Sequence, residues 1–262
     1  MNIVVCIKQV PDTTEIKIDP IKNTLIRTGV PSIMNPFDKN ALETGLQLKD
    51  NYGGKVTVIS MGPAQAQAVL REALSMGADK AYLVTDRAFG GSDTYATSYI
   101  LSQAIKKLGP FDVILGGKQA IDGDTGQTAP SIAEHLNAVR LTHILDVKVS
   151  GDKIIARRQV EEGTEVIETS LPVLCTATKE SNKPRYATIK RKIASLKAEI
   201  SIITLADLPH ADTTKMGLKG SPTKVRKTFT PQRTANGVTI EGSSPAEIAE
   251  TLLNKLVEAK IL

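Results

Sequence analysis

Short apolar runs rich in β-branched residues alternate with helical patterns along the first half of the chain. The sequence predicts strands in four of these runs, Ile3–Ile7, Val56–Ser60, Ala81–Val84 and Val113–Leu115. Helical spacing of apolar residues fills most of the intervals between them. Because strands that alternate with crossover helices pair side by side in one direction, this pattern predicts a parallel sheet.

Three helices are expected within this part of the chain. The first is predicted from about Phe37 to Asn51, and the second carries the apolar series Ala66, Val69, Leu70, Ala73 and Leu74 and ends at Gly77. Ser92 is predicted to cap the third, and polar and apolar residues that alternate between Glu15 and Thr28 predict a hairpin.

The pattern changes after Leu136. Residues 141–149, 153–160 and 164–169 predict three strands joined by short turns, which form an antiparallel ribbon. Pro172–Thr176 is then predicted to return to the main sheet. The fold expected from these patterns is therefore α/β: a parallel twisted sheet with flanking helices, plus an antiparallel ribbon.

From Lys179 onward the chain is basic, rich in proline and predicted to be loop-like until a closing helix. Ser244-Pro245-Ala246-Glu247 is a capping box with proline at the first helical position, and an apolar stripe from Ile248 to Val257 follows it. We therefore divide the chain into residues 1–200, an α/β domain with the antiparallel insertion, and residues 201–262, a C-terminal arm with its helix.

Composition excludes several classes of protein. Two cysteines, Cys6 and Cys175, both inside apolar runs, cannot build a disulfide framework. The net charge is +5, but only 3% of the residues are aromatic, so nucleic-acid binding is not favoured. No apolar run approaches the ~20 residues of a membrane-spanning helix, and no signal peptide is recognisable, which together predict a cytoplasmic protein.

Polar chemistry is concentrated in Gly116–Thr128, directly after the fourth predicted strand. Ligands of open parallel sheets bind beyond the carboxyl ends of the strands, and glycines followed by a helix N-terminus favour a phosphate. Asp122 and Asp124 would repel a phosphate, so they are expected to bind ribose, cap the helix or hold N–H groups. A capped loop without a ligand is the alternative. No metal-ligand spacing and no catalytic grouping of side chains is recognisable.

Five segments taken together resemble the beta subunits of electron-transfer flavoproteins. They are Asn35-Pro36-Phe37, Ser60 to Gln65, Gly77-Ala78-Asp79, Gly117 to Asp122 and Pro184 to Thr188. The resemblance runs in order over nearly the whole chain. It implies a Rossmann-like nucleotide-binding sheet, similar to that of adenine nucleotide α-hydrolases, whose C-terminal arm packs on an alpha subunit.

Conventional members of this family hold AMP, whereas electron-bifurcating members hold a second FAD in the same place. The chain resembles the bifurcating kind at Val10 to Thr13, at Gly123-Asp124-Thr125 with Gln127, and at Gly220 to Thr223. Thr128 also matches the conventional kind. The resemblance therefore favours FAD, with AMP as the alternative.

The resemblance also implies a set of contact residues. Adenosine is expected near Cys6, Ile7, Lys8, Asn35, Phe37, Asp38 and Met61, and the phosphates near Gly123, Asp124, Thr125, Gly126, Gln127 and Thr128. Gln119 and Asp122 belong to the same motif, and a flavin would add Val10, Asp12 and Thr13. The basic loop from Tyr186 to Lys197 matches the segment that docks a partner dehydrogenase, with Ile189 as its apolar anchor beside Lys190, Arg191 and Lys192.

The implied function is electron transfer by bound flavin rather than by catalytic side chains. In the bifurcating kind, NADH is the hydride donor. One electron goes to ferredoxin or flavodoxin, and the other passes through the alpha subunit to a flavin-dependent dehydrogenase, such as an acyl-CoA dehydrogenase. Two alternatives stay open: a conventional subunit with structural AMP, and an AMP-binding sensor or structural subunit of another class.

Overall fold

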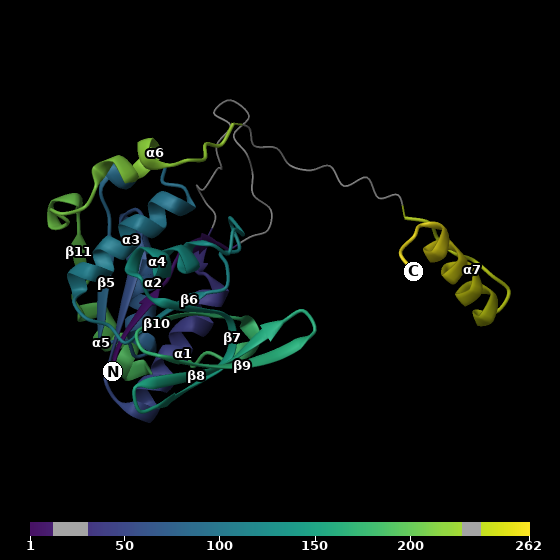
Figure 1. Ribbon diagram of the computed structural model, residues 1–262, viewed down its shortest axis with the longest axis horizontal. Helices are drawn as coiled ribbons and strands as arrows, with labels where there is room; N and C mark the ends of the chain where they lie inside the picture. Colours follow the sequence, from purple (N-terminus) through teal and green to yellow (C-terminus); the bar gives the residue numbers. More distant parts are fainter. Residues whose placement is uncertain (13–30, 227–236) are drawn as a thin grey trace.

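The computed structural model describes residues 1–12, 31–226 and 237–262. Its main feature is a nine-stranded sheet with the order β11-β5-β4-β1-β6-β10-β7-β8-β9 (Figure 1). Neighbouring strands from β11 to β7 are parallel, and the last two pairs are antiparallel. The four strands predicted first are β1 (Asn2–Cys6), β4 (Lys55–Met61), β5 (Lys80–Val84) and β6 (Val113–Gly117). The predicted parallel sheet is therefore confirmed.

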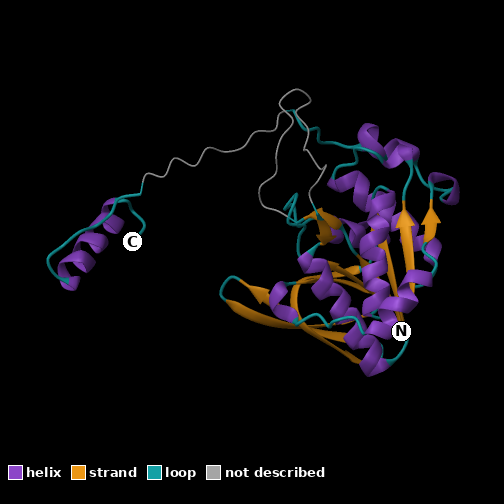
Figure 2. Ribbon diagram, turned by 180° about the vertical axis from the view of Figure 1, so that it is seen from behind, coloured by secondary structure: helices purple, strands orange, loops and turns teal. Residues whose placement is uncertain are grey.

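Helices cover both faces of this sheet, as Figure 2 shows. Helices α1 (Pro36–Tyr52) and α2 (Gln67–Met76) pack on one face, and α3 (Thr94–Leu108) and α4 (Thr128–Leu136) pack on the other. Alternate side chains of each strand enter the two cores because successive strand residues point to opposite faces. Accordingly, Ile3 and Val5 of β1 face α1, whereas Val4 belongs to the core under α3.

The ends of these helices match the sequence signals except at the start of α3. Gly77 ends α2 with a positive φ of 132°. The predicted cap of α3 by Ser92 is wrong, because Asp93 is the N-cap and its carboxylate accepts a hydrogen bond from the Ala96 N–H. Asn35 precedes α1, but its side chain makes no capping bond and instead contacts another loop.

The antiparallel ribbon is present as predicted. It consists of β7 (Val139–Ser150), β8 (Lys153–Val160) and β9 (Gly163–Ser170), after which β10 (Val173–Ala177) enters the main sheet between β6 and β7. A separate two-stranded sheet pairs β2 (Gln9–Pro11) with β3 (Ser32–Met34). The hairpin predicted for Glu15–Thr28 lies outside the described residues.

The basic segment after residue 179 is more ordered than the sequence analysis predicted. The loop expected from Tyr186 to Lys197 contains helix α5 (Ile189–Lys197), whose N-terminus is capped by the Thr188 side chain. Beyond it lie β11 (Ser201–Ile203), which pairs with β5, and the short helix α6 (Gly217–Gly220). The main sheet thus continues past residue 200.

Single helical turns complete the connections. They are η1 (Ala64–Ala66), η2 (Arg87–Phe89), η3 (Lys179–Ser181), η4 (Leu205–Asp207) and η5 (Thr213–Lys215). The closing helix α7 (Pro245–Glu258) begins at the predicted Ser244 cap and buries none of its residues (Figure 1). Its apolar stripe is accessible, and its packing on an alpha subunit stays a prediction. No helix among the described residues is long and apolar enough to cross a membrane.

Candidate functional site

A cleft of about 740 Å³ lies at the carboxyl ends of the central strands. Its walls include the residues that follow β1, β4, β5 and β6, together with the N-terminus of α4. The chain runs from β1 outward to β5 and then returns to β6 on the other side of β1. The loops that follow β1 and β6 therefore lead to opposite sides of the sheet and leave a crevice between them. Such a crevice is the usual ligand site of open parallel sheets.

Asp38 ties two of the cleft's loops together from the first turn of α1. Its carboxylate accepts a hydrogen bond from the Lys8 N–H at 2.7 Å and another from the Gly117 N–H at 3.0 Å. Burial raises the pKa of Asp38 to about 7, although these hydrogen bonds and the Lys8 charge oppose the rise. The carboxylate therefore sets the spacing between the ends of β1 and β6.

Asn35 performs a similar task for the loop that follows β6. Its amide nitrogen donates to the Gln119 carbonyl at 2.8 Å, and its amide oxygen accepts from the Ile121 N–H at 3.2 Å. Asn35 is almost completely buried. A short polar side chain at this position therefore shapes the cleft without lining it.

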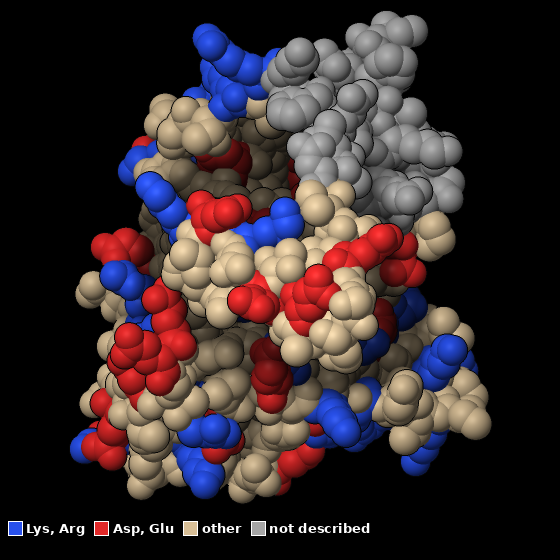
Figure 3. Space-filling model, turned by 90° about the vertical axis from the view of Figure 1, so that its right-hand side faces the viewer, with Lys and Arg blue, Asp and Glu red and all other residues tan. Residues whose placement is uncertain are grey.

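Oppositely charged side chains meet across the cleft. The Lys8 ammonium contacts the Asp122 carboxylate at 2.6 Å, and the Gln119 amide donates to the Asp124 carboxylate. Both acids thus accept hydrogen bonds from neighbouring side chains, and their contact with a ribose stays a prediction. Figure 3 shows that basic and acidic side chains are also interspersed over the face drawn there.

Glycines bring the backbone close to this space. A Cβ on Gly117 would lie 2.4 Å from an Asp38 oxygen, and Gly126 has a φ of 63°. Thr128 and Ala129 open α4 and line the cleft, and no side chain caps this helix. Their N–H groups and the positive end of the helix dipole are the kind of site that binds phosphate.

The segment that carries Ser221 and Thr223 is bonded to Asp93 at the edge of the cleft. The Asp93 carboxylate accepts from the Thr223 N–H at 2.9 Å and from its hydroxyl at 2.8 Å, and the Ser221 hydroxyl accepts from the Asp93 N–H. Burial alone would raise the pKa of Asp93. The hydrogen bonds from Ala96 and Thr223 together outweigh this effect, so the pKa lies below its usual range. Asp93 is given no role in the sequence analysis, which missed this contact.

Most of the contact residues expected from the resemblance share this one cleft. Thirteen of them line it: Cys6, Ile7, Lys8, Val10, Asp38, Met61, Gln119, Asp122, Gly123, Asp124, Thr125, Gly126 and Thr128. Asp12, Asn35, Phe37 and Gln127 do not, and Thr13 lies outside the described residues. The Phe37 ring instead lies 4.9 Å beneath the Lys179 ammonium.

The cleft has no reactive thiol of its own. Burial raises the pKa of Cys6 to about 12, so this side chain is protonated at neutral pH and is a poor nucleophile. No group of three metal-ligating side chains occurs in the part of the chain that the structure describes. The groups that line the cleft are backbone donors, hydroxyls and paired charges, which suit the binding of a ligand.

The segment expected to dock a partner lies on the α2 side of the sheet. The Ile189 side chain is exposed, as are those of Lys190 and Lys192. Arg191 is different, because its guanidinium donates to the Met76 carbonyl at 3.0 Å. It is thus a structural contact as well as a surface charge.

Comparison with known proteins identifies the family. Residues 22–208 match the electron transfer flavoprotein domain. The chain is 53% identical to an electron transfer flavoprotein subunit beta of Clostridium acetobutylicum, which covers 98% of both chains. It is 51% identical to that of Megasphaera elsdenii and 48% identical to the caffeyl-CoA reductase-Etf complex subunit CarD of Acetobacterium woodii, in both cases over the full length of each chain. The chain therefore belongs to the electron transfer flavoprotein family, as a beta subunit.

Proposed function

We propose that this subunit holds FAD in the cleft and that, with an alpha subunit, it bifurcates electrons from NADH. Ferredoxin or flavodoxin accepts one electron, and a flavin-dependent dehydrogenase accepts the other. The observation that carries the proposal is the extent of the cleft, which runs from the ends of β1 and β6 to Val10, Pro11 and Ser32 of the small β2–β3 sheet.

The size and lining of the cleft fit a dinucleotide. Its volume of about 740 Å³ lies in the upper part of the ~300–1,000 Å³ typical of small-molecule sites. The polar wall at Asp122, Thr125 and the α4 N-terminus suits ribose and phosphate. Val10 and Pro11 supply apolar surface that suits an aromatic ring system, and AMP has no second ring system to place there.

Bound flavin would supply hydride acceptance and single-electron transfer. The chain's own residues would hold it in place. Asp38 and Asn35 would fix the loops, Lys8 paired with Asp122 would form part of the wall, and the α4 N-terminus with the Thr125 hydroxyl would donate hydrogen bonds to the phosphates. These groups position a cofactor and shape its electrostatic surroundings, so none of them has to react.

A relative's name supports the dehydrogenase partner. CarD is named as a subunit of a caffeyl-CoA reductase-Etf complex. A partner that acts on an acyl-CoA thioester is therefore consistent with this subunit, and Ile189 on its exposed segment is the expected contact.

The test is an electron count with the purified heterodimer, ferredoxin and a dehydrogenase with its acceptor. Bifurcation predicts that ferredoxin is reduced by NADH only when the dehydrogenase and its acceptor are both present. Two NADH should then be consumed for two single-electron reductions of ferredoxin and one two-electron reduction of the acceptor. If the heterodimer carries electrons from the dehydrogenase but never oxidises NADH, the conventional alternative with AMP replaces this proposal.

A further inference from the structure

Helix α5 presents an apolar face that none of the described residues 1–12, 31–226 and 237–262 covers. Ser195 is its only buried residue, whereas Ile189, Ile193 and Leu196 are 80%, 56% and 67% exposed. These three side chains are spaced at i, i+4 and i+7 and therefore lie on one side of the helix. The helix packs against α2 through the face that carries Ser195, and polar contacts with α2 add to this packing.

Two arginines fasten α5 to α2. Arg191 of α5 donates to the Met76 carbonyl at the end of α2, at 3.0 Å. In the opposite direction, Arg71 of α2 donates to the Ser195 carbonyl and to the Ala198 carbonyl at the end of α5. The carbonyls at a helix C-terminus lack partners within the helix, so cationic donors suit them.

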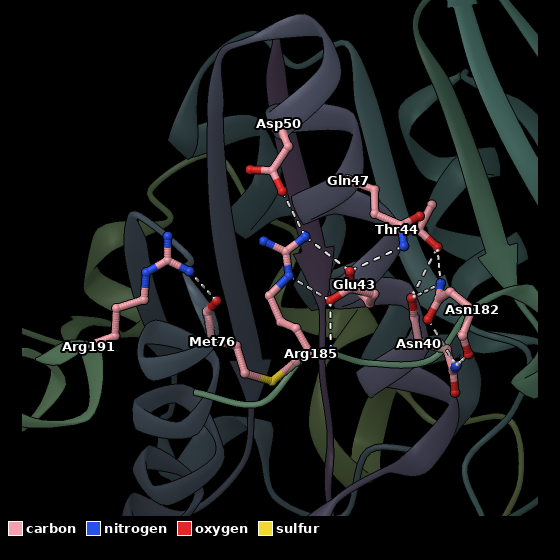
Figure 4. Close-up of polar contacts among 9 residues, drawn as sticks. All are labelled: Asn40, Glu43, Thr44, Gln47, Asp50, Met76, Asn182, Arg185 and Arg191. Carbon is pink, nitrogen blue, oxygen red and sulfur yellow. Dashed lines mark hydrogen bonds and ion pairs between the residues drawn. The ribbon is translucent and has the colours of Figure 1, made fainter. Parts of the chain in front are cut away.

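The chain entering α5 is fastened to α1 by an ion pair, drawn in Figure 4. Arg185 contacts the Glu43 carboxylate in bidentate fashion, with Nε to Oε2 at 2.9 Å and Nη2 to Oε1 at 3.0 Å. The Arg185 N–H donates to the same carboxylate at 3.1 Å, and its Nη2 also contacts Asp50 at 2.8 Å. The Glu43 side chain is only 5% exposed.

Asn182 adds a second attachment next to the first. Its amide donates to the Asn40 carbonyl at 3.0 Å and to the Thr44 hydroxyl at 2.9 Å, and the Asn40 amide donates back to the Asn182 carbonyl at 2.8 Å. Residues 182–185 are therefore bound along one side of α1, between the end of β10 and the start of α5 (Figure 4).

We propose that Glu43 is a positioning residue for the docking of the partner dehydrogenase, acting through Arg185 on the placement of α5. This inference rests on the proposed function, in which Ile189 is a docking contact. Glu43 is buried and cannot touch a partner. Its carboxylate accepts hydrogen bonds from Arg185 and, within α1, from the Gln47 amide at 3.2 Å, and of these two only Arg185 lies on the chain that leads into α5. The partner would meet Ile189, Ile193 and Leu196 as a preformed face and would not have to order the helix on binding.

An isosteric variant of Glu43 and a charge-preserving variant of Arg185 distinguish the positioning of α5 from a direct contact between Arg185 and the partner. Glu43→Gln keeps the side-chain shape, but its amide N–H₂ replaces one acceptor and faces a guanidinium donor. Arg185→Lys keeps the positive charge and loses the bidentate geometry. If Arg185 met the partner through its charge alone, Arg185→Lys would leave docking unchanged. If Arg185 positions α5, docking requires its bidentate contact with Glu43, which lysine cannot make.

The experiment uses the complete heterodimer with an acyl-CoA dehydrogenase that the wild-type heterodimer reduces. If the docking-competent placement of α5 falls to about a tenth of the population, the apparent KM for the dehydrogenase rises roughly tenfold at unchanged kcat. Glu43→Gln and Arg185→Lys should each give this result, and the double variant should be little worse than either. Hydrogen exchange at the amides of residues 192–197 should accelerate in both, while nucleotide content is retained.

Ile189→Ala separates the docking role of Ile189 from the positioning role of Glu43. If Ile189→Ala raises KM but Glu43→Gln leaves KM and the amide exchange of α5 unchanged, the positioning role is wrong and docking stands. If Ile189→Ala has no effect, the docking assignment itself is wrong. A heterodimer with Glu43→Gln that loses nucleotide along with affinity would show a general structural defect and would also overturn the positioning role.

Discussion

Replacing Gly117 with alanine tests the contact on which the shape of the cleft depends. A Cβ at this position would lie 2.4 Å from the Asp38 Oδ1 atom and 2.6 Å from the Phe37 Cβ atom, so α1 and the end of β6 must move apart. Overpacking of this kind costs about 1–3 kcal/mol, and loss of the 3.0 Å hydrogen bond from the Gly117 N–H to the carboxylate adds about 1.5–3 kcal/mol.

The summed destabilisation of about 2.5–6 kcal/mol should lower the Tm of the heterodimer by roughly 5–24 °C, because each kcal/mol shifts a chain of this size by about 2–4 °C. Nucleotide retention after gel filtration should fall in parallel. Gly237→Ala is the matched control, since its Cβ would meet nothing within 4 Å and Gly237 does not line the cleft. Equal Tm and equal retention in the two variants would refute the role given to the Asp38 contacts.

Three further predictions follow from the same geometry. Asp122→Ala removes the carboxylate that lies 2.6 Å from the Lys8 ammonium and should weaken nucleotide binding about 5- to 150-fold, as measured by equilibrium dialysis. Asp152→Ala, in an exposed turn, is the control and should leave the affinity unchanged. Equal affinities of the two variants would place the ligand elsewhere. Because burial raises the pKa of Asp38 from 3.8 to about 7, its contribution to stability is complete below pH 4 and is lost as the pH rises through 7. Asp38→Asn should therefore flatten this part of the Tm profile, and an unaltered slope would contradict the pKa. Ile189→Ala should slow reduction of the partner dehydrogenase with Tm and flavin content intact, and Lys192→Gln should mainly reduce the salt dependence of that rate; a nucleotide-free Ile189 variant would mean that this residue supports the fold.

Local patterns were sufficient for the central sheet and the ribbon. A run such as Val113–Leu115 is apolar on every residue because both faces of the sheet are covered, and the sequence shows this directly. The cleft could likewise be placed from the position of Gly116–Thr128 behind a central strand. Predicting the ligand class also needed the family resemblance, because the glycines and hydroxyls by themselves are compatible with a capped loop.

Contacts between distant residues could not be predicted in the same way. The pairing of Glu43 with Arg185 joins positions 142 residues apart, and no local pattern marks either side chain. Asp93 rather than Ser92 caps α3, and the Ser92 hydroxyl instead donates to the Phe89 carbonyl and accepts from the Gly217 N–H, 125 residues away. Helix α5 did carry a usable signal, the spacing of Ile189, Ile193 and Leu196, which the nearby Pro184 and the run of cations obscured.

The most direct test of the central claim is the cofactor content of the purified heterodimer. Extracted nucleotides, separated by chromatography and counted against protein, should give two FAD and no AMP for each pair of subunits. The Asp122→Ala variant should lose one FAD selectively, because the cleft belongs to this chain. One FAD with one AMP would contradict the assignment of flavin to the cleft, and retention of both FAD molecules by the variant would contradict the assignment of Asp122 to the binding site.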